Sequence, residues 1–432
     1  MAGKKTQAQL TPEEKLQQAL VPEAEQPYKV PANWCWVKAP FIFNIEYGKG
    51  LSSKELLEKG YPVFGANGQI GYYNEYMFEN AKALMSCRGA YSGTMNLSLP
   101  KSFVTSNSLI IDSKEAGMSE HFTYFLFSAL NKKSIISGSA QPQITVQAFA
   151  KYPIPLPPLV EQQRIVERIE SLFAKLDEGK ENLQNVLDGF ETRKAAILHK
   201  AFTGELTANW RKQHDVSIDS WGKKKLGEIN EIGTGGTPSR KIAAYYNGNI
   251  PWIKTGEILW NYIYDSEEKI TNNAINNSSA KFYSKGTVLV AMYGQGLTRG
   301  RAAILAIEAT TNQAVCALKP KQVLKSKFLF YYFMENYWKY REKAIGGNQP
   351  NYSIKMISKW NINLPTLDEQ TEIVRIIDDL LAKEQQAKEL AENALAKIDL
   401  IKKAILARAF RGELGTNNPA DEPAVELLKR ML

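Results

Sequence analysis

The hydrophobic positions of this chain form two long helical patterns, each following a stretch of short strand-like runs. In residues 160–203, apolar side chains recur every three or four positions, beginning with Ile165, Ile169 and Leu172. The same spacing returns in residues 368–411. Because residues three and four apart share one face of an α-helix, each pattern predicts a helix with an apolar stripe along one side.

The two helical patterns are copies of one another. Residues 151–206 align with residues 359–414 at a constant offset of 208, without a gap, and 26 of the 56 aligned positions are identical. Identity this high indicates a duplication. Each copy follows prolines and stops before a glycine, Gly204 or Gly412, as helices that end at a left-handed residue do. We therefore predict one helix of about 42 residues, about 63 Å long, in each copy.

Helices of this length usually pair along their apolar faces as a coiled coil. Two separate amphipathic helices, each lying on a globular domain, are the alternative.

Glu161 and Glu369 place negative charge near the positive N-terminal ends of the two helices. The segment between the helices joins the end of the first to the start of the second, and compact domains keep their ends close together. We therefore expect an antiparallel coiled coil with a globule at each end, related by an approximate two-fold axis.

Strand-like runs with aromatic residues and Gly or Asn turns fill the stretches before each helix. These runs are residues 61–76, 103–112, 286–294 and 310–320. Aromatic-rich segments at 121–130 and 328–338 have the composition of short buried helices. The fold class that follows is α+β (mixed α/β), with two pseudo-repeated globules on a shared plan. The expected segments are an N-terminal segment with a short helix (1–27), the first globule (28–159), the first helix (160–206), the second globule (207–367), the second helix (368–414) and a C-terminal tail with a short helix (415–432).

Charge is distributed unevenly over these segments. The chain has 54 Lys and Arg residues against 45 Asp and Glu residues, a formal net charge of +9. Residues 160–203 and 368–411 each carry −1, whereas residues 28–159 carry +4 and residues 210–367 carry +11. Two basic, aromatic-rich globules on a stiff spacer suit contacts with two separated patches of a nucleic acid duplex. Binding of an acidic partner, or basicity without a function, is the alternative.

Signatures of catalysis and of metal binding are scarce. Three widely separated cysteines and three histidines leave little material for a disulfide framework, a metal site or acid–base chemistry. Residues 233–238 are glycine-rich but lack the Gly-Lys-Ser/Thr ending of a phosphate-binding loop. The acidic doublets Glu267–Glu268 and Asp378–Asp379 are interpreted as solvated surface. With no apolar run of 18 residues and no signal peptide, we expect a soluble, cytoplasmic, non-enzymatic protein.

Several stretches together resemble the specificity (S) subunit of type I restriction-modification systems. Residues 235–240 (GGTPSR) and 245–252 (YYNGNIPW) are similar to the opening of that family's target recognition domain. The duplicated helices are similar to its conserved spacer regions. Residues 67–71, 87–89 and 107–108 resemble parts of a second, divergent recognition domain.

The resemblance implies a division of labour among subunits. An S subunit has no catalytic centre; it reads a bipartite, asymmetric site on double-stranded DNA, one half per domain. It also holds two methyltransferase (M) subunits and the restriction (R) subunits, on which S-adenosylmethionine, ATP and Mg are expected to bind. The coiled coil would then fix the separation and rotational phase of the half-sites. A subunit of a modification-only system and a coiled-coil scaffold that does not bind DNA remain alternatives.

Loop residues that can reach base edges or phosphates are the candidate contacts, because bidentate readout uses Arg or Lys for guanine and Asn or Gln for adenine. The candidates for base contacts are Arg88, Tyr91, Ser92, Ser239, Arg240, Gln295, Thr298, Arg299 and Arg301. The candidates for phosphate contacts are Lys49, Lys54, Lys101, Lys241 and Lys254. Phe202 and Phe410, at the ends of the two helices, are candidates for docking the M subunits. Packing of these rings on the neighbouring globule is the alternative.

Overall fold

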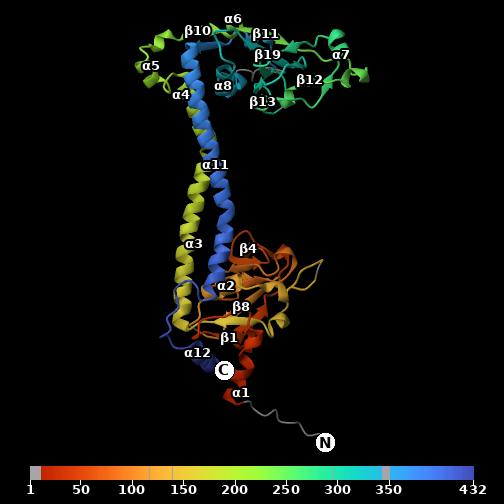
Figure 1. Ribbon diagram of the computed structural model, residues 1–432. Helices are drawn as coiled ribbons and strands as arrows, with labels where there is room; N and C mark the ends of the chain where they lie inside the picture. Colours follow the sequence, from red (N-terminus) through yellow and green to blue (C-terminus); the bar gives the residue numbers. More distant parts are fainter. Residues whose placement is uncertain (1–10, 116, 139, 295, 343–350) are drawn as a thin grey trace. The chain divides into compact units, whose positions relative to one another are not determined.

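The computed structural model describes residues 11–115, 117–138, 140–294, 296–342 and 351–432. The chain divides into two units (Figure 1). Unit 1 is Met1–Leu183 with Asn393–Leu432, and unit 2 is Gln184–Glu392. Each unit therefore contains one globule together with part of each duplicated helical segment.

The duplicated segments are helical over nearly the expected lengths. The second copy is a single helix, α11 (Leu367–Ala409). The first copy is two helices, α3 (Leu159–Asp188) and α4 (Phe190–Phe202), so the prediction of one uninterrupted helix is wrong for this copy. Gly204 and Gly412 adopt the predicted left-handed conformation, with φ of 83° and 76°.

The break between α3 and α4 at Gly189 has a local cause. Arg193 folds back over this glycine, where its Nη2 donates to the carbonyl of Val186 at 2.8 Å and its Nε donates to Glu384 of α11 at 2.8 Å. A β-carbon at position 189 would lie 2.3 Å from the Arg193 guanidinium, so glycine leaves the room that this side chain occupies. The aligned position in the second copy is Lys397, inside the unbroken α11.

Within each unit the helical segments run antiparallel. In unit 1, Asp177 of α3 pairs with Lys402 of α11 at 2.6 Å, and Ile169, earlier in α3, clusters with Leu406, later in α11. The contacts in unit 2 have the same sense, Arg193 with Glu384 and Leu198 with Ile377. The predicted antiparallel pairing is confirmed inside each unit.

The globule of unit 1 contains two small sheets and a strand pair. Its strands are β1 (Cys35–Lys38), β2 (Phe43–Tyr47), β3 (Tyr61–Gly65), β4 (Gly68–Tyr73), β5 (Ala83–Ser86), β6 (Met95–Leu97), β7 (Phe103–Val104), β8 (Ser108–Ser113) and β9 (Pro153–Leu156). The sheets have the orders β2-β8-β5-β6 and β4-β3-β7, and β1 pairs with β9. Helix α2 (Glu120–Ala129) packs its phenylalanines into the core beside the first sheet.

The globule of unit 2 has the same parts. Its strands are β10 (Gly222–Lys225), β11 (Asn230–Thr234), β12 (Ile250–Ile253), β13 (Tyr262–Ile263), β14 (Lys269–Ile270), β15 (Phe282–Tyr283), β16 (Val288–Ala291), β17 (Ala302–Leu305), β18 (Ala309–Thr311), β19 (Val315–Pro320) and β20 (Asn361–Leu364). The sheets have the orders β11-β19-β16-β17-β13 and β14-β12-β18-β15, and β10 pairs with β20. The helices of this globule are α5 (Ala208–Gln213), α6 (Leu226–Ile229), α7 (Asn272–Asn276), α8 (Ser326–Glu335), α9 (Tyr337–Glu342) and α10 (Ile354–Ile357).

The strand orders show that both globules follow one plan, as the sequence predicts. Strands β2-β8-β5-β6 of unit 1 correspond to β11-β19-β16-β17 of unit 2, to which β13 is added at the edge. In the second sheets, β3 runs parallel to β7 and β12 runs parallel to β18, whereas β4 and β14 are their antiparallel neighbours. Each of the four predicted strand-like runs contains strands. The second aromatic-rich segment differs from its prediction, because a cap at Asn336 ends α8 and α9 follows.

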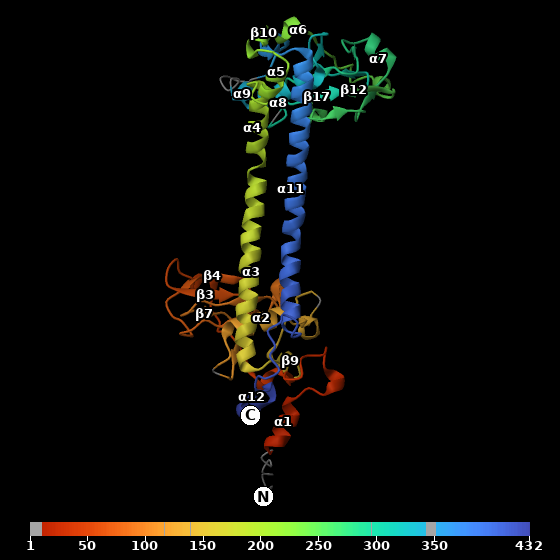
Figure 2. The ribbon, with the colours of Figure 1, turned by 60° about the vertical axis from the view of Figure 1, so that its left-hand side comes forward.

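The first and the last described helices meet in unit 1. Helix α1 (Pro12–Ala19) lies against α12 (Ala424–Met431), where Lys15 Nζ donates to the Leu432 carbonyl at 3.3 Å (Figure 2). The Ala424 amide donates to Asn33 at 2.9 Å, directly before the Trp34 that leads into β1. Residues beyond α11 therefore complete the base of the unit 1 globule.

Candidate nucleic-acid interface

One exposed loop occupies the same structural position in both units. In unit 1 it joins β5 to β6 (the β5–β6 loop, residues 87–94), and in unit 2 it joins β16 to β17 (the β16–β17 loop, residues 292–301). Equivalent backbone bonds close the two loops, Gly93 N to Ser86 O at 2.8 Å and Gly300 N to Ala291 O at 2.9 Å. Both closing glycines have a φ of 88°. The unit 2 loop is the longer one.

The anchoring of these loops follows the duplication. The carbonyl of Cys87 accepts from the Ile144 amide at 2.9 Å, and the carbonyl of Met292 accepts from the Tyr352 amide at 3.1 Å. Ile144 and Tyr352 are 208 residues apart, which is the offset of the duplicated helices. The duplication therefore extends from the helices into the globules, although little identity remains there.

The glycine-rich segment of unit 2 packs directly on the neighbouring backbone. A β-carbon on Gly235 would lie 1.8 Å from the Thr311 carbonyl oxygen, and the next amide, of Gly236, donates to that oxygen at 3.0 Å. This close approach excludes any side chain at Gly235. The loop that follows β11 is thereby held beside the turn that precedes β19.

Unit 1 has a counterpart of this segment that sequence comparison does not reveal. A β-carbon on Gly48 would lie 2.4 Å from the Val104 carbonyl oxygen, and the Lys49 amide donates to that oxygen at 2.9 Å. Residues 47–50 (YGKG) therefore take the place of 234–237 (TGGT). A single shared glycine is too weak a signal in sequence, and only the hydrogen-bond pattern identifies the match.

The base candidates of unit 1 lie together on the β5–β6 loop. Arg88 is exposed at its start, and the Tyr91 ring is 49 % exposed near its tip. The Ser92 hydroxyl instead donates to the Pro142 carbonyl at 2.7 Å, so it braces the loop. Of the phosphate candidates, Lys49 is exposed in the YGKG segment, Lys54 is exposed on the short 53–55 helix, and Lys101 lies in a separate turn, 3.9 Å from Glu79.

In unit 2, the structure places Thr298, Arg299 and Arg301 on the β16–β17 loop, and Gln295 lies outside the described residues. Arg341 of α9 holds this loop, because its two terminal nitrogens donate to the Arg299 and Gly296 carbonyls at 2.6 Å each. The Arg299 guanidinium lies over the Tyr352 ring, 5.6 Å from its centre. The sequence contains no sign of the bracing by Arg341.

A second group of candidates gathers around one carboxylate. Arg240 and Lys254 both bind Glu268, at 2.6 and 2.9 Å, and the Arg240 guanidinium stacks over the Tyr246 ring at 4.2 Å. Hydrogen bonds from Arg240 and Lys254 lower the pKa of Glu268 to about 2. Glu268 lies at the surface, as interpreted from the sequence, with its side chain 30 % exposed, and there it pairs with two candidate DNA contacts and offsets part of their charge. The neighbours Ser239 and Lys241 are exposed.

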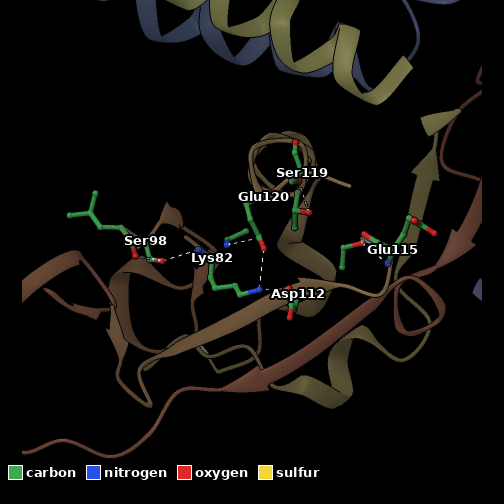
Figure 3. A network of polar contacts seen from close by, with 10 residues as sticks. Lys82, Ser98, Asp112, Glu115, Ser119 and Glu120 are labelled. Carbon is green, nitrogen blue, oxygen red and sulfur yellow. Dashed lines mark hydrogen bonds and ion pairs between the residues drawn. The ribbon is translucent and has the colours of Figure 1, made fainter. Parts of the chain in front are cut away.

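A partly buried polar network fixes the start of β5, the strand that leads to the unit 1 loop. Figure 3 shows Lys82 directed toward Asp112 and Glu120, with Nζ–O distances of 2.7 and 3.3 Å. The Lys82 amide donates to the Ser98 hydroxyl at 2.8 Å, and Glu120 also accepts from the Ala83 amide. Burial raises the pKa of the Glu120 carboxyl, and Lys82 opposes this effect. The network joins α2 to both neighbouring strands.

The two phenylalanines proposed to dock M subunits pack on their own units. Phe410 is fully buried, with its ring 5.6 Å from that of Phe122 on α2, so docking by Phe410 is contradicted in this structure. Phe202 is half-buried, with its ring 5.0 Å from that of Phe328 on α8. The Phe410 ring is therefore attached to its own globule, as in the alternative. Phe202 keeps an accessible part that lines a pocket of unit 2, so docking by Phe202 stays a prediction.

The described residues contain no candidate metal cluster and no candidate membrane-spanning helix. No described group of three or more His, Cys, Asp or Glu side chains is arranged to hold a metal ion. No helix in the described part of the chain combines the length and apolar character needed to cross a bilayer.

Known proteins share this architecture. The Escherichia coli protein "Type I restriction enzyme EcoDI specificity subunit" is 23% identical over 426 residues, which cover 91% of this chain and 92% of that protein. The fold is similar to that of the HsdS subunit from Thermoanaerobacter tengcongensis, with a TM-score of 0.62 at 19% identity over 90% of this chain and 100% of the other. A second structure, from work on "complex assembly and conformational transition of the type I R-M system", gives a TM-score of 0.60 at 20% identity with the same coverage.

The family described as "Type I restriction modification DNA specificity domain" matches two stretches of the chain. They are residues 31–187 and 218–393, which together exceed half of its length. Each match covers one globule and much of the long helical segment that follows it, so the resemblance inferred from the sequence is confirmed. The chain belongs to the family of type I restriction-modification DNA specificity proteins.

Proposed function

We propose that this chain reads a bipartite, asymmetric sequence on double-stranded DNA, with one half-site for each unit. The observation that carries the proposal is the pair of equivalent loops, β5–β6 and β16–β17, which join matched strands of matched sheets. The candidate side chains on these loops are Arg88 and Tyr91 in unit 1 and Thr298, Arg299 and Arg301 in unit 2. Side chains on two rigid, related scaffolds suit direct readout of base edges, because each sheet holds its loop in a defined place.

The asymmetry of the site follows from the differences between the loops. The β5–β6 loop carries Arg88 and Tyr91, whereas the longer β16–β17 loop carries Thr298, Arg299 and Arg301. Different donor and acceptor patterns select different bases. Unit 2 also holds more of the positive charge, so we expect it to contribute more of the phosphate binding.

We further propose that the chain is a non-catalytic scaffold for M and R subunits, which would bind the methyl donor, ATP and Mg. The name of the E. coli relative, a restriction enzyme specificity subunit, supports this role. The description of complex assembly for one similar structure supports it as well. Adenine methylation would then be the reaction that this chain directs.

Methylome sequencing tests the proposal. The chain is co-expressed with its M subunit in a host without adenine methylation, and we expect a split, non-palindromic adenine motif. A continuous or palindromic motif would contradict the bipartite reading.

Variants assign the half-sites to the units. If Arg299 reads a base edge, Arg299→Ala relaxes one position of one half-site by about 1–3 kcal/mol and leaves the other half-site unchanged. Arg88→Ala, as the matched variant of unit 1, relaxes the other half-site. A uniform loss of affinity with a shallower salt dependence would instead make either arginine a phosphate contact.

A further inference from the structure

Unit 2 contains a pocket of about 470 Å³ that the DNA-reading loops do not use. It lies where the end of α4 meets strands β10 and β20 and the C-terminal ends of α8 and α9. Its floor is aromatic, because the rings of Tyr340 and Trp360 stack face to face at 3.7 Å. Residues from five separate elements therefore converge on one cavity.

The rim of this pocket is positively charged. Lys223, Lys339 and Lys359 line it and are exposed. Lys339 acts on Glu335, where its charge opposes the effect of burial on the pKa of that carboxyl. The carboxylate in the lining belongs to Glu335, whose pKa is raised by burial and which lies 3.8 Å from His199. The pocket thus combines an aromatic floor with an excess of positive charge, which favours an anionic ligand that carries a ring.

The duplication identifies the equivalent place in unit 1. Trp360 aligns with Tyr152 at the offset of 208, and Thr203, which also lines the pocket, aligns with Arg411. Lys223 pairs with Asn363 in the strand pair β10–β20, just as Trp36 pairs with Pro155 in β1–β9. Trp36, Tyr152 and Arg411 therefore mark the counterpart of the pocket.

In unit 1 that place is filled by the chain itself. The Tyr28 ring packs edge-on against Trp36 at 4.8 Å, the Arg411 guanidinium lies 5.4 Å from its centre, and the Trp36 indole donates to the Tyr28 carbonyl at 3.1 Å. Burial raises the pKa of Tyr28 to about 12. Burial also raises the pKa of Tyr152, and the neighbouring Tyr28 adds a smaller effect in the same direction. An aromatic side chain from a bend of the N-terminal segment thus occupies the unit 1 counterpart.

We propose that the unit 2 pocket binds an acidic peptide segment of a partner protein, with an aromatic side chain inserted as Tyr28 is inserted in unit 1. The occupant of the unit 1 counterpart favours a peptide over a nucleotide. Where unit 1 has the neutral Trp36, unit 2 has Lys223, and Lys339 lies on the same rim. Two positive charges there favour a peptide with carboxylates next to its inserted aromatic side chain. The partner used in the test is the M subunit, and in this respect the proposal rests on the proposed function.

Charge reversal with a matched control tests the pocket. We expect Lys223→Glu/Lys359→Glu in the full chain to weaken binding of the purified M subunit by about tenfold or more, with a reduced salt dependence. Lys151→Glu changes the residue that aligns with Lys359 in unit 1, where Tyr28 already fills the counterpart, and should leave the affinity within about twofold. Unchanged M-subunit affinity in a folded double variant overturns the proposal. Equal losses in both variants do so as well.

Photocrosslinking identifies the occupant. With Lys339→p-benzoylphenylalanine in the complex with the M subunit and a DNA duplex, we expect a crosslink to an M-subunit segment in which an aromatic residue has Asp or Glu neighbours. Crosslinking to the duplex, to a segment without acidic residues, or to neither overturns the proposal. A normal split methylation motif together with any of these results would leave the proposed function standing and remove only this inference.

Discussion

The N-terminal ends of α3 and α11 each carry a buried glutamate, and the two glutamates have different environments. Glu369 at the start of α11 and Glu161 at the start of α3 are both fully buried, and each accepts a hydrogen bond from a tryptophan indole. Glu369 also binds the Arg211 guanidinium at 2.6 Å. The donors to Glu161 are the neutral groups of Trp34, Thr416 and Asn417, at 2.7, 3.2 and 2.9 Å.

This difference shows what the duplication preserves. The buried carboxylate and the indole are retained at matched positions, because together they join the helix to the segment that enters the globule. The residue that balances the charge is not retained. In unit 1 the negative charge depends on neutral donors and on the positive N-terminal end of α3, whereas unit 2 adds a full positive charge. Replacing the glutamate at the N-terminal end of each helix should therefore destabilise the two units to different extents.

The largest expected effect is that of Glu369→Ala. Arg211 is only 8 % exposed, so removing the carboxylate leaves a buried guanidinium without its counter-charge. Breaking a buried ion pair in this way costs about 3–5 kcal/mol. Native-state hydrogen exchange, followed in strands β10 and β20 of unit 2, measures the loss.

Glu161→Ala is the matched control in unit 1. It leaves neutral donors unpaired and removes a buried charge, so we expect a smaller loss of about 1–3 kcal/mol in the exchange of β1 and β9. Equal costs in the two units would show that Arg211 contributes no more than a neutral donor, and the comparison would fail.

A second difference lies behind the two reading loops. In unit 1 the space beside Gly93 holds the Lys132 side chain, whereas in unit 2 the space beside Gly300 holds the rings of Tyr337 and Tyr352. Burial lowers the pKa of Lys132 to about 8 from 10.5. The ammonium group donates to the Phe127 carbonyl at the end of α2.

The lowered pKa makes the stability of unit 1 depend on pH. Above about pH 10.5 the amine is neutral in both the folded and the unfolded chain, so its burial carries no charge penalty. As the pH falls from 10.5 to 8, the unfolded chain takes up the proton first and the folded state loses stability, by up to about 3 kcal/mol; below pH 8 the penalty is constant. We expect this slope in the wild type and not in Lys132→Met, measured as the difference between their exchange free energies. Parallel curves would contradict the assignment.

Much of this architecture was predictable from the sequence. The helical spacing and the aligned copies predicted the long helices, and alternating runs with Gly and Asn turns predicted the strands, because both signals are local. The break at Gly189 was not predictable, because it depends on Arg193 reaching Glu384 on another helix. The YGKG counterpart of the glycine-rich segment was also missed, since it is defined by contacts with a distant carbonyl.

The candidate site was predicted in part, for the same reason. Arg88 and Arg299 were named because they are arginines in expected loops, and the structure places them on equivalent loops. Glu268 binds Arg240 and Lys254, which are 28 and 14 positions away in the chain. The bracing by Arg341 joins residues more than 40 positions apart. Such contacts depend on how the sheets fold, and residue type alone does not specify them.

The smallest expected effect distinguishes the two copies of the long helix. Lys397 occupies in α11 the position that Gly189 occupies between α3 and α4, and α11 is continuous there. Lys397→Gly removes a good helix former from a helix interior without supplying the Arg193 side chain that stabilises the break in the first copy. We therefore expect a cost of about 1 kcal/mol, with faster amide exchange in the surrounding turn of α11. A loss of stability well above this value would mean that the Lys397 side chain itself makes a contact that stabilises the helix pair. No loss would mean that α11 tolerates a break as readily as the first copy does.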